Sequence, residues 1–116
     1  MKGKISASFN VRNMFLAFML VLSSGLRSQD LSAQYFKAGN KAYTDKQYDQ
    51  AIENYTNILA LGKENATIYY NIGNAYYRLK NYPLAILNYE KSLKLSPRNV
   101  DAKYNLELPT QRLLIK

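Results

Sequence analysis

The sequence lacks the residue types on which much enzyme chemistry depends. Its 116 residues contain no cysteine, no histidine and no tryptophan. Without cysteine and histidine there is no disulfide, no thiolate nucleophile and no imidazole base or metal ligand. A glycine-rich phosphate loop is also missing, and the carboxylates, Glu53 and Glu90 among them, are spread along the chain. We therefore expect neither catalysis nor a bound cofactor or metal, and stability must come from packing.

Acidic residues are scarce as well, with eight against sixteen basic ones, which gives a formal net charge of +8. Half of this excess lies in the first 28 residues, which hold four basic residues and no acidic one. The other basic residues are scattered singly along the chain. Because nucleic-acid binding needs clustered Lys and Arg, we do not expect a nucleic-acid partner.

Long apolar runs are limited to one, Met14 to Leu22, which follows a basic, polar start and precedes the small residues 23–25. This order is typical of a signal peptide. As a helix the run would span about 14 Å, against about 30 Å for a bilayer core. We predict that residues 1–28 are a signal peptide, cleaved after Gly25 or Ser28, and that the protein is exported. An uncleaved anchor and an N-terminal helix of a cytosolic protein are the alternatives.

Two consecutive stretches, residues 32–65 and 66–99, align with each other at an offset of about 34 residues. Identical pairs include Tyr35/Tyr69, Gly39/Gly73, Asn40/Asn74, Tyr43/Tyr77, Tyr48/Tyr82, Ala51/Ala85, Ile52/Ile86, Tyr55/Tyr89 and Leu61/Leu95. So many identities at one fixed offset predict a structural repeat.

Each repeat reads as two helices, and we predict an all-α fold with helices at 33–45, 48–61, 66–79 and 82–95 and another from Val100. A glycine inside a helix costs about 1 kcal/mol relative to alanine, so Gly39 and Gly73 predict a close approach of the second helix. The small Ala51 and Ala85 would permit it. The turn residues Asp45 and Asn81 are predicted helix caps. Prolines stop helices, so Pro97 should end one helix and Pro109 should stop or kink the last.

The period and the Gly, Tyr and Ala spacings resemble those of tetratricopeptide (TPR) repeats. The second repeat matches the family pattern at Tyr69, Ile72, Gly73, Tyr76, Ala85, Tyr89 and Pro97, and the first departs at Ala42, Ile58 and Lys63. The resemblance implies antiparallel helix pairs in a short right-handed superhelix. It predicts two repeats at 32–65 and 66–99, and a partial third repeat or capping helix with a tail at 100–116. It also implies a protein-interaction module.

The resemblance further implies a concave groove lined by the first helices. Its slots hold Ala33, Phe36, Asn40, Tyr43, Thr44, Thr67, Tyr70, Asn74, Tyr77 and Arg78, continued by Asp101 and Tyr104. Asparagine amides both donate and accept hydrogen bonds, and aromatic rings offer contact area. We predict partner binding by Phe36, Asn40, Tyr43, Tyr70, Asn74, Tyr77, Arg78 and Tyr104. The alternative is that these residues pack against the tail or the next helix.

One binding mode of the family, a clamp for a C-terminal carboxylate, does not fit the residues. Asn40 and Asn71 occupy its two asparagine slots, but its basic slots hold Phe36, Asp101 and Asn105. Without cations a carboxylate would be poorly held. We therefore expect a protein or peptide partner that is not recognised through a terminal carboxylate.

The segments 69–97 and 101–108, together with the N-terminal segment, resemble the N-terminal part of the TPR protein of the bacterial aerotolerance (Bat) family. That resemblance implies a periplasmic or inner-membrane-attached adaptor linked to oxidative-stress complexes. Family members are longer, so the alternatives include a shortened family member and a truncated, non-functional fragment. A tethered structural adaptor, and self-association through the open C-terminal face beyond Leu106, remain further alternatives.

Overall fold

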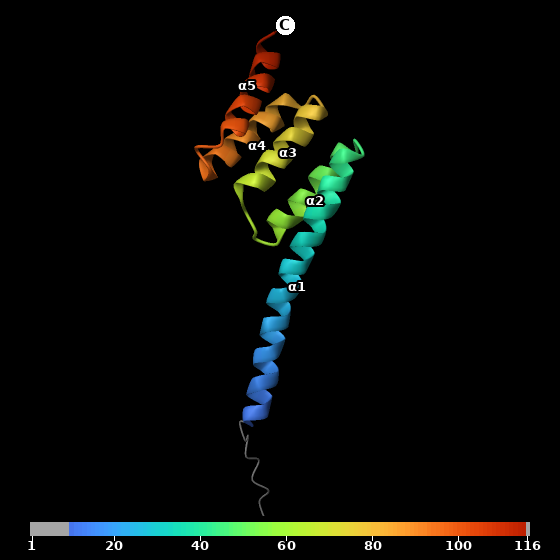
Figure 1. The fold of residues 1–116 in the computed structure, drawn as a ribbon, viewed down its shortest axis with the longest axis vertical. Helices are drawn as coiled ribbons and strands as arrows, with labels where there is room; N and C mark the ends of the chain where they lie inside the picture. Colours follow the sequence, from blue (N-terminus) through green and yellow to red (C-terminus); the bar gives the residue numbers. More distant parts are fainter. Residues whose placement is uncertain (1–9, 116) are drawn as a thin grey trace, which may run out of the picture. The chain divides into compact units, whose positions relative to one another are not determined.

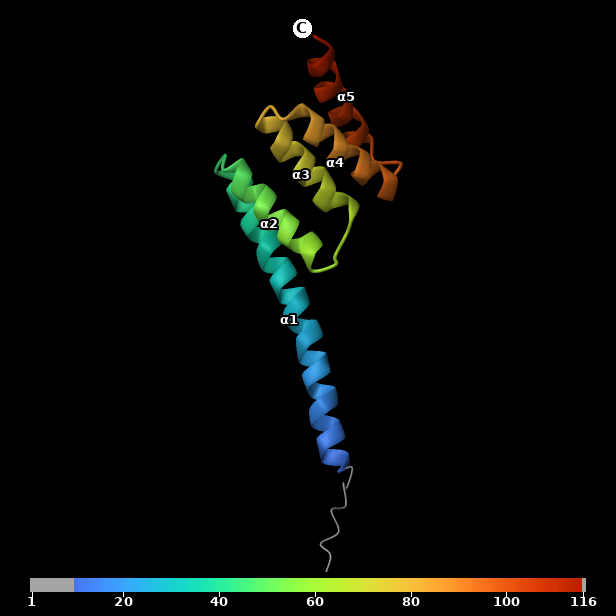
Figure 2. The same cartoon turned by 180° about the vertical axis from the view of Figure 1, so that it is seen from behind.

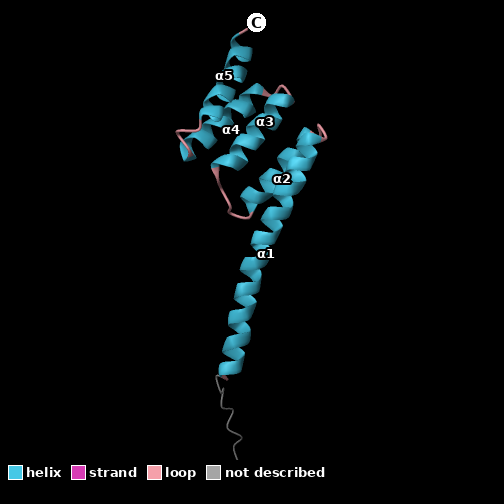
Figure 3. Ribbon diagram, in the orientation of Figure 1, coloured by secondary structure: helices cyan, strands magenta, loops and turns pink. Residues whose placement is uncertain are grey.

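The computed structural model describes residues 10–115, and the side chains of all of these except residues 17–30. Helices joined by short turns make up this part of the chain, and it contains no strand (Figure 3). The helices are α1 (Val11–Thr44), α2 (Tyr48–Ala60), α3 (Ala66–Arg78), α4 (Tyr82–Leu95) and α5 (Val100–Leu114).

The all-α prediction is confirmed, and three helices agree with their predicted bounds to within a residue. Helix α1 is the exception, because it begins at Val11 and not near residue 33. No proline lies between these positions to interrupt it. The helix thus runs through the segment predicted to be a signal peptide, whose residues 1–9 lie outside the described part. Its cleavage remains a prediction.

The chain divides into two compact units, residues 1–30 and 31–116, and the repeats lie in the second. Within the second unit α2, α3 and α4 lie side by side, and α5 follows beside α4 (Figures 1 and 2). Consecutive helices run in opposite directions, as the predicted helix pairs require. Among the described residues, no helix is both long and apolar enough to cross a membrane.

The contact between the two helices of each repeat is a tyrosine ring against a glycine. Tyr55 and Tyr89 are each only 1 % exposed. A Cβ atom added to Gly39 would lie 2.6 Å from the Tyr55 ring, and one added to Gly73 would lie 2.7 Å from the Tyr89 ring. These glycines therefore leave space that the rings fill, and the predicted close approach is confirmed. The surrounding core contains Ala42, Ala51, Ile58, Ile68 and Ile72.

Asparagines cap three helices, since the side chains of Asn65, Asn81 and Asn99 accept hydrogen bonds from the first turns of α3, α4 and α5. The prediction for Asn81 is confirmed, and the one for Asp45 is wrong. Asp45 lies two residues before the N-cap of α2, out of reach of its first turn, and instead forms an ion pair with Lys41 at 2.7 Å.

Of the two outcomes predicted for Pro109, a stop or a kink, the stop is wrong, because helix α5 continues to Leu114. A proline in a helix interior removes one backbone hydrogen bond and costs about 3 kcal/mol. The ring of Pro109 is fully buried, and this burial offsets part of that cost. The segment 100–114 therefore forms a continuous helix in the place of the first helix of a third repeat.

We predict that Gly39→Ala and Gly73→Ala each destabilise the protein by about 1–3 kcal/mol, because the added methyl group overpacks the tyrosine ring. At an unobstructed helix position the same change would stabilise by up to about 1 kcal/mol. Urea unfolding followed by circular dichroism gives the sign directly. A stabilising effect at both positions would contradict the close packing described above.

Candidate functional site

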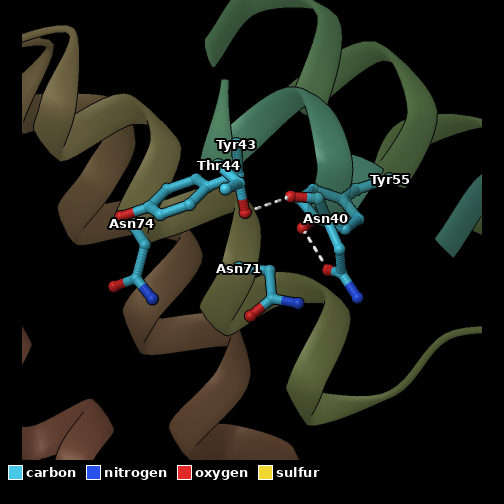
Figure 4. A pocket seen from close by; sticks show the side chains of 6 residues that line it. All are labelled: Asn40, Tyr43, Thr44, Tyr55, Asn71 and Asn74. Carbon is cyan, nitrogen blue, oxygen red and sulfur yellow. Dashed lines mark hydrogen bonds between the residues drawn. The ribbon is translucent and has the colours of Figure 1, made fainter. Parts of the chain in front are cut away.

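A cavity of about 210 Å³ opens between the first helices of the two repeats, α1 and α3. Figure 4 shows the side chains around it, with those of α1 facing those of α3. The lining residues are Asn40, Tyr43, Thr44, Tyr55, Asn71 and Asn74. None of them is charged, so the cavity offers only amide and hydroxyl groups and aromatic surface.

Tyrosine hydroxyls fix two of the three asparagine amides. The Tyr55 hydroxyl donates to Oδ1 of Asn40 at 2.6 Å, and the Tyr89 hydroxyl donates to Oδ1 of Asn74 at 2.6 Å. Burial raises the pKa of both tyrosines above the ordinary value, so both hydroxyls stay protonated and able to donate at neutral pH. Because Oδ1 of each asparagine accepts these bonds, the Nδ2 groups remain the available donors.

The third amide, Asn71, forms no hydrogen bond with any part of the chain that the structure describes. Its side chain is half-buried and lies at the edge of the cavity (Figure 4). An amide placed in this way has one acceptor and two N–H donors available to a ligand. The groove prediction omitted Asn71, although the comparison with the carboxylate clamp had singled it out.

The corresponding gap between α3 and α5 is closed by the protein itself. Nδ2 of Asn105 donates to Oδ1 of Asn74 at 2.9 Å and to the Tyr70 hydroxyl at 3.0 Å. From the sequence, Asn105 was identified only as a residue that stands where the carboxylate clamp has a basic residue. Its exact offset of 34 residues from Asn71 was the signal that would have related the two gaps.

The aromatic residues predicted to line the groove also pack against the second helices. Ring centroids lie 6.2 Å apart for Phe36 and Tyr55 and 6.0 Å apart for Tyr70 and Tyr89. Tyr43 and Tyr77 likewise contact the tyrosines that open the second helices, at 5.3 Å and 5.7 Å. The first-helix rings are half-buried and contribute to the helix pairs, and of these four only Tyr43 also lines the cavity.

The remaining predicted residues lie away from the cavity. Nε of Arg78 donates to the Tyr48 hydroxyl at 3.0 Å, and its guanidinium lies over that ring. Tyr104 on α5 is 62 % exposed. The structure therefore brings Asn40, Tyr43 and Asn74 together at the cavity with Thr44, while Ala33, Thr67 and Asp101 are exposed outside its lining.

These observations define a class: an all-helical repeat protein whose first helices line a groove. Comparison with known families identifies the repeats. The tetratricopeptide repeat model matches residues 66–99, and a TPR repeat model matches residues 39–80. Residues 39–99 therefore contain tetratricopeptide repeats, as the sequence predicted.

One solved structure agrees with this assignment. The TPR domain of Arabidopsis OM64 is similar with a TM-score of 0.70 and 28 % identity, over 75 % of this chain and 72 % of that one. The first TPR of Spaghetti (RPAP3), bound to the HSP90 peptide SRMEEVD, is less similar, with a TM-score of 0.48 and 22 % identity over 73 % and 94 % of the two chains. A search of curated proteins gives no significant match.

Proposed function

We propose that this protein is a non-catalytic binding module that holds an extended, uncharged segment of a partner protein in the groove between α1 and α3. The observation that carries the proposal is the cavity whose lining contains three asparagine amides and no charged residue. Tetratricopeptide domains are protein-interaction modules, and a groove lined by side-chain amides suits the carbonyl and N–H groups of a peptide backbone.

Charge supports a neutral ligand over an anionic one. Arg78 is exposed and engaged with Tyr48, outside the cavity lining. No Lys or Arg lines the cavity. A terminal carboxylate buried without a cation would lose its hydration with little compensation. An internal segment of a partner meets no such cost.

Export to the bacterial cell envelope is the second part of the proposal, and the order of basic, apolar and small residues before residue 28 supports it. In that setting the module would serve as a periplasmic or membrane-attached adaptor. A contribution to aerotolerance complexes follows from the resemblance of segments 69–97 and 101–108 to the Bat family. If the N-terminal segment stays uncleaved, the same groove would belong to a tethered adaptor.

The groove is tested with peptides selected on the full chain from a phage-displayed random library, then synthesised with both ends blocked. We expect Asn40→Ala combined with Asn71→Ala to weaken binding in calorimetry by about tenfold or more, since two hydrogen bonds of about 1 kcal/mol each are lost. Glu53→Ala, an exposed change on α2, is the matched control and should leave the affinity unchanged. Circular dichroism should show equal helicity in all variants.

Peptides that bind only with a free C-terminal carboxylate would contradict the neutral groove. Equal affinity of the double variant and the control would place the ligand elsewhere on the molecule.

Export is tested by expressing the chain in a bacterium, fractionating the cells and sequencing the N-terminus of the product. We expect envelope fractions to contain a chain that begins just after Gly25 or Ser28, because a signal peptidase removes the apolar segment. An intact Met1 in membrane fractions would indicate the tethered adaptor, and an intact Met1 in the cytosol would overturn export.

A further inference from the structure

The groove has two gaps, a first between α1 and α3 and a second between α3 and α5. Equivalent residues occupy the two gaps, but their hydrogen bonds differ. Asn71 and Asn105 occupy equivalent positions of successive repeats, 34 residues apart. In the second gap Asn105 donates two hydrogen bonds, to Asn74 and Tyr70. In the first gap, the side chain of Asn71 forms no hydrogen bond within the described chain.

The acceptors available to the two asparagines differ by a single oxygen atom. Asn40 is the equivalent of Asn74, and each accepts a tyrosine hydroxyl at 2.6 Å. The equivalent of Tyr70 is Phe36, which has no hydroxyl. The two rings are otherwise placed alike, because Phe36 lies 6.2 Å from Tyr55 at 55° and Tyr70 lies 6.0 Å from Tyr89 at 50°.

The missing hydroxyl explains why one amide is bound and the other is not. Holding an asparagine side chain in one rotamer costs conformational entropy, which two hydrogen bonds offset better than one. With Phe36 in place of a tyrosine, the amide of Asn71 gains too little from turning toward α1 and stays open to the groove.

We propose that Phe36 determines where the groove binds: it leaves the Asn71 amide unpaired, so the first gap receives the ligand while Asn105 seals the second. The ligand class rests on the function proposed above, and the difference between the gaps does not. The ligand places one main-chain carbonyl against Nδ2 of Asn71. In the second gap the Asn105 carboxamide, which has the same functional group as a peptide bond, bonds through Nδ2 to Asn74 and Tyr70.

Phe36→Tyr supplies the missing hydroxyl and tests the proposal directly. Nitrogen-15 NMR of the full chain follows the side-chain amide of Asn71, assigned with Asn71→Asp. We expect Phe36→Tyr to slow exchange of the Asn71 amide protons with water by about tenfold, as expected when hydrogen bonds of about 1 kcal/mol form, and to bring their signals close to those of Asn105. The affinity for the blocked peptides selected above should fall by a similar factor.

Tyr70→Phe is the matched variant, because it removes the same oxygen from the second gap. Asn105 exchange should accelerate, while Asn71 exchange and thermal stability of the first repeat should hardly change. This variant keeps the proposal testable even if Phe36→Tyr does not fold. Unchanged exchange of Asn105 in Tyr70→Phe would overturn the assigned role of the hydroxyl.

Two further outcomes would overturn the role proposed for Phe36 without refuting the proposed binding function. Fast exchange of Asn71 in folded Phe36→Tyr would overturn the proposal, even if peptides still bind the groove. A protected Asn71 with undiminished peptide affinity would also overturn it, because the ligand would not use the first gap. Failure of the unmodified chain to bind any selected peptide would refute the proposed function instead, whatever the exchange rates are.

Discussion

Both repeats depend on one contact, in which a buried tyrosine of the second helix lies against a glycine of the first. The ring of Tyr55 occupies the space at Gly39, and the ring of Tyr89 occupies the space at Gly73. The same tyrosines then use their hydroxyls to fix an asparagine that follows each glycine in sequence. Helix spacing and the orientation of the groove amides are therefore set by the same side chain.

This coupling explains why the groove is polar without being charged. Each tyrosine hydroxyl occupies the oxygen of its asparagine, so Asn40 and Asn74 present N–H groups to the groove. No residue that lines the cavity is charged, and the guanidinium of Arg78 is held on Tyr48. Under the proposed function, a partner would be recognised through its backbone and through aromatic contact, because no charged residue lines the cavity.

The repeat, its helices and the glycine contacts could be predicted from the sequence, because each depends on spacing within 34 residues. The start of α1 could not be predicted. The N-terminal apolar segment and the first repeat can both be helical, and no residue pattern marks a boundary between them. The predicted stop at Pro109 was wrong for a related reason. The free-energy cost of a proline inside a helix can be read from the sequence, but the burial that offsets it depends on how α5 packs.

The groove was predicted as a set of positions along the first helices. The helix face that lines it was predicted more accurately than the contacts of individual side chains. Asn40, Tyr43 and Asn74 do line the cavity. The pairing of Asn105 with α3, and the absence of such a pairing for Asn71, depend on which rotamers and acceptors meet across helices. A sequence gives no direct measure of that, although the change from tyrosine to Phe36 at one register position was visible in it.

The central claim is that the amides between α1 and α3 read the backbone of a neutral segment. A crystal structure of the full chain with a selected, end-blocked peptide tests it most directly. The account predicts the peptide in the cavity, with a main-chain carbonyl within hydrogen-bonding distance of Nδ2 of Asn71. A peptide bound on the outer face of α2 or α4, or one that contacts the groove only through charged side chains, would contradict it.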